Sequence, residues 1–150
     1  MVVSPPFRRA AMAADPVQAL EFVMHVLKRR AIVFFISDFI GPAFRDAHLR
    51  TPLGVAARKH DVVAVSVNDP AELELPSIGL VEFEDAETGR LEVVDTREPA
   101  LRKRFKEFRQ QQAEELKRLL RQLGVDHIAL STEEDFTAKL HTFFQQRARR

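Results

Sequence analysis

Three short polar segments of the sequence hold side chains that could do chemistry, and each follows an apolar stretch. They are Ser37-Asp38, Asn68-Asp69 and Ser131-Thr132-Glu133. Carboxylate, amide and hydroxyl oxygens are the ligands of hard cations such as Mg²⁺. Two carboxylates such as Asp38 and Asp69, if they lie close together, could hold a catalytic metal ion. Each segment also has an ordinary explanation, because Asp, Asn and Ser brace turns and cap helices.

Known catalytic signatures are missing from the chain. Its five glycines do not form a phosphate-binding loop or a dinucleotide fingerprint, and there is no Gly-x-Ser-x-Gly nucleophile elbow. No two of its five histidines have the i, i+4 spacing that places two imidazoles on one metal ion. We therefore expect a protein that is not an enzyme and has no cofactor. The alternative is a small metal-dependent enzyme that uses Asp38 and Asp69.

One cluster of basic residues could attract RNA or an acidic protein surface. Its members lie in or just before the first half of a predicted helix: Arg97, Arg102, Lys103, Arg104, Lys106 and Arg109. No aromatic base-stacking platform is interleaved with them, and a charge run on a helix usually marks a solvated face. With 23 basic and 22 acidic residues, the chain also has no overall field that favours nucleic acid. We expect no nucleic acid partner, and RNA binding through residues 97–109 stays as an alternative.

The composition predicts one globular domain. Cysteine is absent, which suits a reducing compartment, so we expect a cytoplasmic protein. The chain begins without an apolar signal region and contains no apolar run long enough to span a membrane. Residues 1–14 have no sustained periodicity and are expected to be a loose leader. Residues 15–150 are expected to form the domain.

The first half of that domain reads as a β-α-β unit. A helix is predicted over residues 16–28, where Asp15 is the cap and Pro16 occupies the first position. Residues 31–36 are an uninterrupted apolar run, which predicts a strand buried on both faces. A helix restarted at Thr51-Pro52 and ending near residue 60 leads to a second strand over residues 62–67. Two strands in this order are expected to pair in parallel.

The second half adds a hairpin, a long helix, a strand and a final helix. Residues 81–84 and 91–94 predict a β-hairpin with its turn over residues 85–89. A helix over residues 99–123 should end at Gly124, and a last strand is expected over residues 126–130. The spacing from Ser131 to Glu134 is that of a capping box. It should open a helix whose buried side is formed by Phe136, Leu140, Phe143 and Phe144.

These elements predict an α/β fold: an open, mostly parallel sheet flanked by helices, with an added β-hairpin. Ligands of such sheets collect at the carboxyl ends of the strands. The polar segments after residues 31–36 and 62–67 are therefore the candidate site.

Several separately placed motifs resemble the bacterial domain of unknown function 58 family, a von Willebrand factor A-like group. The similarity extends over residues 15–150 and is carried by segments in the same order as in the family: residues 29–39, 60–65, 69–76, 79–81, 87–89 and 124–126, and the ending from Phe143 to Arg150.

The resemblance implies a partial von Willebrand factor A-like, Rossmann-like fold that binds proteins and works with a MoxR-type AAA+ ATPase in assembly or chaperone-like roles. Such domains hold Mg²⁺ through Asp-x-Ser-x-Ser, a separate Thr and an Asp after the central strand. Only Asp38, with Ser37 beside it, has a counterpart here, and Ala14 stands where the family often has Thr. We therefore expect a degenerate metal site, and a partner-binding surface at Asp38, Asn68 and Asp69. Mg²⁺ would require the missing N-terminal half.

Compared with that family, the first three strands of the sheet are absent, as in a truncated domain. The strand at residues 31–37 should then lack a neighbour along one edge. An unpaired apolar edge without Lys, Pro or a bulge templates association. We expect a homodimer or aggregation through this edge.

Overall fold

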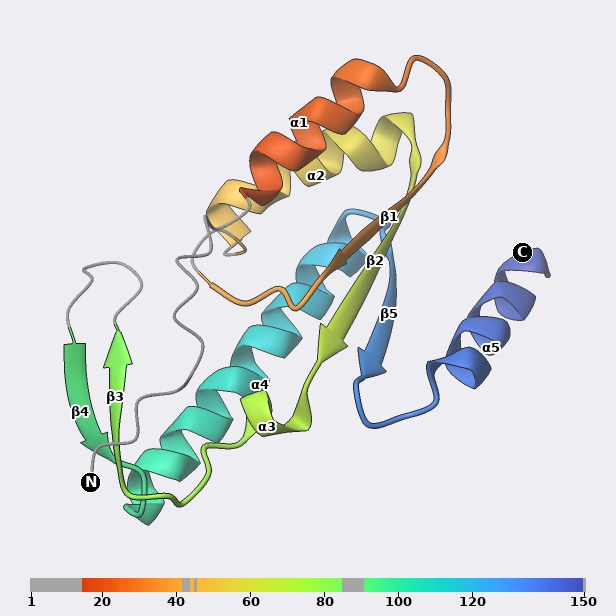
Figure 1. Ribbon diagram of the computed structural model, residues 1–150. Coiled ribbons are helices and arrows are strands. Elements are labelled where there is room, and N and C mark those ends of the chain that lie inside the picture. Colours follow the sequence, from red (N-terminus) through yellow and green to blue (C-terminus); the bar gives the residue numbers. More distant parts are fainter. Residues whose placement is uncertain (1–14, 42–43, 45, 85–90, 150) are drawn as a thin grey trace.

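The computed structural model describes residues 15–41, 44, 46–84 and 91–149 (Figure 1). The expected leader at residues 1–14 and the predicted hairpin turn at residues 85–89 lie outside these residues. In chain order the elements are α1 (Pro16–Val26), β1 (Ile32–Ser37), α2 (Asp46–Lys59), β2 (Asp61–Asn68), α3 (Pro70–Leu73), β3 (Leu80–Glu84), β4 (Leu91–Asp95), α4 (Pro99–Gln122), β5 (Asp126–Ser131) and α5 (Phe136–Ala148).

Three parallel strands form the main sheet, in the order β1-β2-β5. β2 is the central strand, and its residues 62–66 are all buried. Helices connect the strands, so both pairs are parallel, as the β-α-β pattern predicts. The predicted α/β fold, with an open parallel sheet and a separate antiparallel hairpin, is confirmed.

The two faces of the sheet are covered unequally. α1, α2 and α4 lie on one face, where the larger core includes Leu20, Leu53 and Leu120 (Figure 1). The other face has a smaller core around Val63 and Ile128, and α5 is the helix among the described elements that covers it. No described residue of α5 is fully buried.

An ion-pair network anchors α5 at the amino ends of the strands. Arg147 Nε lies 3.0 Å from the Asp126 carboxylate, and the same guanidinium also bonds to Asp61. The predicted buried side of α5 is correct for Leu140 and Phe143, which pack on the smaller core. It is wrong for Phe136 and Phe144, which are 56% and 42% exposed, although the Phe144 ring lies edge-on to Phe34 of β1.

The prediction that residues 31–36 are buried on both faces is wrong. Exposure alternates along β1, and the side chains of Ile32, Phe34 and Ile36 are 60%, 46% and 63% exposed. Val33 and Phe35 pack against the larger core on the opposite face. β1 is an edge strand of the described sheet. α5 packs over β5 and β2 and contacts β1 through the Phe144 ring, whose centroid lies 6.1 Å from that of Phe34.

The helix ends test the capping residues that were predicted from the sequence. Asp15 caps α1 as predicted, with its carboxylate accepting from the Val17 amide at 2.9 Å. Gly124 has a φ of 67° and ends α4 as predicted. The capping box at Ser131 is wrong, because Asp135 caps α5 and accepts from the Thr137 amide at 2.8 Å.

α2 begins at Asp46 and continues through Pro52, so the predicted restart at Thr51-Pro52 is wrong. A proline inside a helix costs about 3 kcal/mol. Burial of apolar side chains offsets this cost, at about 2 kcal/mol for each leucine. The fully buried side chains of α2 lie on one face: Leu49, Leu53 and Ala56.

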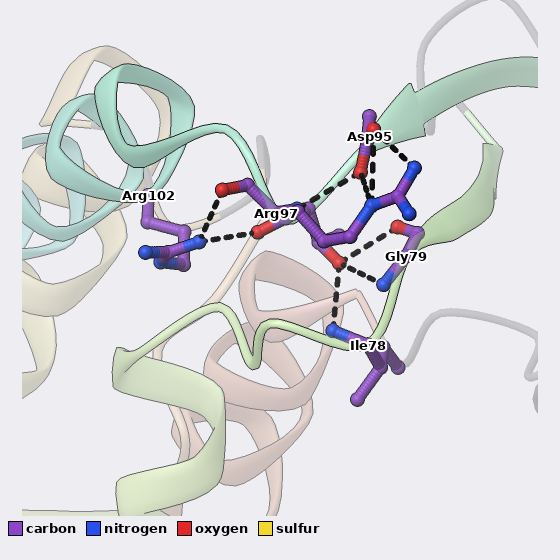
Figure 2. Close-up of polar contacts among 6 residues, drawn as sticks. Ile78, Gly79, Asp95, Arg97 and Arg102 are labelled. Atoms are coloured by element: carbon purple, nitrogen blue, oxygen red, sulfur yellow. Dashed lines mark hydrogen bonds and ion pairs between the residues drawn. The ribbon is translucent and has the colours of Figure 1, made fainter.

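The hairpin β3–β4 is antiparallel, as predicted, and is joined to the start of α4 through Thr96. The Thr96 side chain has an exposed fraction of 0%. Its hydroxyl accepts from the Ile78 amide at 3.1 Å and the Gly79 amide at 3.0 Å, and donates to the Gly79 carbonyl at 2.7 Å. Figure 2 shows Ile78 and Gly79 at this junction.

None of the helices in the described part of the chain is both long and apolar enough to cross a membrane.

Candidate functional site

A cavity of about 200 Å³ lies at the carboxyl ends of β1 and β2 and is bordered by His127 and Ala129 of β5. α4 forms its opposite wall, and Leu73 of α3 contributes an apolar side chain. We call this space the carboxyl-end cavity. Its polar side chains come from all of these strands and from α4: Asp38, Ser66, Asn68, Arg109, Gln112, Lys117 and His127. The expectation that polar side chains gather at this edge of the sheet agrees with the structure.

Asp38 is held in a tight turn at the mouth of the carboxyl-end cavity. Its Oδ1 accepts from the Ile40 amide at 3.0 Å, and the Ser37 hydroxyl lies 3.3 Å away. Ser37 Oγ accepts from the Phe39 amide at 3.0 Å. Phe39 has a φ of 55°, a conformation that bulky residues rarely adopt. Its ring packs edge-on against Phe35, so the contacts of this turn hold a strained backbone.

The residues present do not fit a Mg²⁺ site. Mg²⁺ requires near-octahedral oxygen ligands, whereas Asp38 Oδ1 and Ser37 Oγ are both engaged in the turn. Among the residues that the structure describes, no group of three or more His, Asp or Glu side chains could hold a metal ion. Asn68 lines the carboxyl-end cavity together with Asp38, but Asp69 is not among its lining residues.

A serine and a histidine from neighbouring strands form a pair inside the carboxyl-end cavity. Ser66 Oγ and His127 Nε2 are 2.9 Å apart. Ala64 of β2 is in register with His127 of β5, and Ser66 lies two residues further along β2 on the same face. Burial lowers the pKa of His127, and the nearby charge of Lys117 lowers it further. The imidazole is therefore neutral at pH 7 and acts as a hydrogen-bonding group.

Two cations of α4 complete the lining. Arg109 Nη1 donates to Gln112 Oε1 at 3.1 Å, while Arg109 Nε is buried and has no hydrogen-bond partner. Lys117 pairs with Glu114 at 2.7 Å on the outer side of the helix. The cavity is lined from α4 by residues 109, 112, 116 and 117. Their i, i+3, i+7, i+8 spacing places them on one face of the helix.

Sequence reasoning missed Ser66, His127 and the cavity-facing role of Arg109. Two signals were available. Ser66 continues the inward alternation of β2 after residues 62 and 64. Arg109 lies within the stripe of α4 that also contains Leu116.

The rest of the predicted basic cluster is largely engaged in local contacts. Arg97 binds Asp95, with a distance of 2.7 Å between Nη2 and Oδ2 (Figure 2). Arg102 Nη1 donates to the carbonyl oxygens of Thr96 at 2.9 Å and Arg97 at 2.8 Å. Lys106 Nζ lies 2.5 Å from the Glu74 carboxylate. These contacts tie α4 to the hairpin and to the segment after α3.

The sequence model described as "Protein of unknown function DUF58" matches residues 6–115. The chain belongs to this family. This match confirms the resemblance to the domain of unknown function 58 family. The matched residues include β1, β2 and the hairpin, together with most of α4.

Similar proteins occur in mycobacteria. An uncharacterised protein of Mycobacterium avium is 31% identical over 150 residues, an alignment that covers 99% of this chain and 85% of the relative. Uncharacterised proteins of Mycobacterium bovis and Mycobacterium tuberculosis are 30% identical over 148 residues, covering 99% of this chain but 45% of each relative. The chain thus spans less than half of these longer proteins. No solved structure matches it.

Proposed function

We propose that this chain is a non-enzymatic protein-interaction module that binds a polypeptide strand along the open edge of β1. The observation that carries the proposal is that β1 pairs with β2 on one side and with no described strand on the other. Its outward side chains Ile32, Phe34 and Ile36 are also exposed. An added strand would form hydrogen bonds with this edge, and its own side chains on the same face would pack beside these three.

The register of the sheet identifies the backbone groups that face the open edge. The Asp61 amide donates to the Ala31 carbonyl at 2.8 Å, and Ile32 is in register with Asp61. In a parallel strand the backbone groups of successive residues point to alternate sides. The amides of Val33 and Phe35 therefore point to β2. Those of Ile32, Phe34 and Ile36 point outward.

β1 has none of the features that usually protect an edge strand, such as a lysine, a proline or a bulge. Complete burial of an Ile or Phe side chain contributes about 1.5–3 kcal/mol. An added strand would bury three such side chains in part, which offsets part of the cost of association of about 4–15 kcal/mol. Backbone hydrogen bonds would add to this and set the register.

As the partner we propose a MoxR-type AAA+ ATPase, which is supported by the resemblance to the von Willebrand factor A-like group. In the absence of that partner, a second copy of the chain can supply the strand, with the two β1 edges antiparallel around a twofold axis. The homodimer expected from the sequence would use this same edge.

Proline at Phe34 tests the proposal, because it removes an outward amide and leaves the hydrogen bonds to β2 intact. Phe34→Ala is the matched control, since it also removes the ring but keeps the amide. Proline at Val33 is unsuitable, because that amide points to β2. Circular dichroism should show that both Phe34 variants remain folded.

Light scattering should show the wild type and Phe34→Ala self-associating below about 100 μM, where a modest micromolar interface is populated, and Phe34→Pro remaining monomeric. In titrations with the purified MoxR-type ATPase of the same organism, the wild type and Phe34→Ala should bind more tightly than Phe34→Pro. A wild type that is monomeric at this concentration, together with ATPase binding that Phe34→Pro leaves unchanged, would overturn the proposal.

A further inference from the structure

The carboxyl-end cavity lies at the end of the sheet, and the proposed strand partner of β1 does not account for its chemistry. We infer that this cavity binds a carboxylate group, which Arg109 and Lys117 recognise. The inference is independent of the β1 edge.

Arg109 is the main reason for this inference. Gln112 accepts from its Nη1, whereas its Nε is buried without a hydrogen-bond partner. Within the described part of the chain, no carboxylate pairs with this guanidinium. A buried donor without a partner costs free energy, and a ligand that accepts from it would remove this cost. The Nε and Nη2 groups form the edge that can bind both oxygens of a carboxylate.

The other residues that line the cavity favour a ligand with a single negative charge. Lys117 adds a second cation, although it is already partly neutralised by Glu114. Asp38 lines the same cavity and would repel a dianion such as phosphate. His127 is held neutral by burial and by Lys117. Because Glu114 already binds Lys117, Arg109 is the cation that a single negative charge of the ligand would pair with.

The apolar lining and the volume limit the ligand to a small group. Leu73 and Leu116 would contact the carbon atoms next to the carboxylate, and about 200 Å³ is too small for a nucleotide. Arg109 Nε is buried, so the proposal requires a rotation of the Arg109 side chain that brings Nε to the ligand. The fitting chemistry is that of a glutamate-sized acid. It could come from an acidic side chain of a bound protein or from a small free acid.

The test uses two matched probes that differ only in charge, N-acetylglutamate α-amide and N-acetylglutamine α-amide. Titrations are followed by NMR of the full chain, through the Arg109 Nε–H signal and the backbone amides of Ala113 and Ala129. The acid should shift these signals in a saturable manner, and the neutral amide should not. A glutamate-containing peptide with neutral ends distinguishes the two sources: tighter binding of the peptide than of the acid assigns the site to a protein ligand.

Arg109→Gln should weaken binding of the acid by at least about tenfold, since hydrogen bonds to charged groups are the strong ones. Arg104→Gln is the control, because Arg104 is exposed on the same helix and does not line the cavity. Equal shifts with acid and amide would overturn the inference, as would equal binding by the Arg109 and Arg104 variants. Tighter binding of inorganic phosphate would overturn the assignment to a carboxylate.

Discussion

Replacing Thr96 by valine should lower the free energy of unfolding by about 2–3 kcal/mol. Valine has nearly the same shape as threonine, so the loss comes from the hydroxyl and its three hydrogen bonds. Each such bond contributes about 1 kcal/mol net. The Ile78 amide keeps a contact with the Pro76 carbonyl at 3.0 Å. The Gly79 amide has no other described partner, so its desolvation is the largest part of the cost.

Urea unfolding followed by circular dichroism measures this change, and Thr96→Ser is the control because it keeps the hydroxyl. Hydrogen exchange should show faster opening of β3 and β4 in the valine variant, since Thr96 connects the hairpin to α4. Two results would refute the reasoning: a valine variant within about 0.5 kcal/mol of the wild type, which is the ordinary range for surface substitutions, or a serine variant as unstable as the valine variant.

Three further predictions concern single side chains. His60 is 3% exposed and neither ring nitrogen has a hydrogen-bond partner, so His60→Leu should raise the stability by about 1 kcal/mol, and a lower urea midpoint would contradict this. Hydrogen bonds from the Arg97 side chain and then from its backbone amide lower the pKa of Asp95 to about 2. The resulting stabilisation is present above the unfolded-state pKa of about 3.9 and is lost as the pH falls through about 2. NMR titration of the Asp95 carboxyl carbon should show this midpoint, and Arg97→Ala should raise it. Calorimetry with Mn²⁺ should detect only weak binding, because Asp38 Oδ1 is engaged in its turn; a micromolar site that Asp38→Ala abolishes would show that the ligands were wrongly identified.

Some features of this protein follow from the sequence because they depend on residues only a few positions apart. Residues 62–67 were predicted to form a strand, and they lie in β2, the central strand of the described sheet. Asp15 and Gly124 marked helix ends, because a cap and a left-handed turn involve only neighbouring backbone groups. The order of strands and helices was then enough to predict parallel pairing.

Other features depended on which elements pack together. Residues 31–36 are as apolar as a buried strand, but their outer face is exposed because β1 is at the edge of the described sheet. Pro52 is a local signal against a helix interior, and burial of one face of α2 outweighed it. In both cases the outcome depended on whether another element covers one face of the strand or helix. The local sequence pattern does not contain this information.

The carboxyl-end cavity combines residues that the sequence predicts with residues that only the tertiary structure brings together. Asp38 and Asn68 could be predicted at its mouth, because the carboxyl ends of parallel strands lie at one edge of a sheet. The Ser66–His127 pair joins residues far apart in the sequence, and Arg109 reaches the same space from α4. Residue types and spacing alone determined the strands, the parallel sheet and the polar loops. Only the tertiary structure decided which side chains meet, because the strand register and the packing of α4 bring them together.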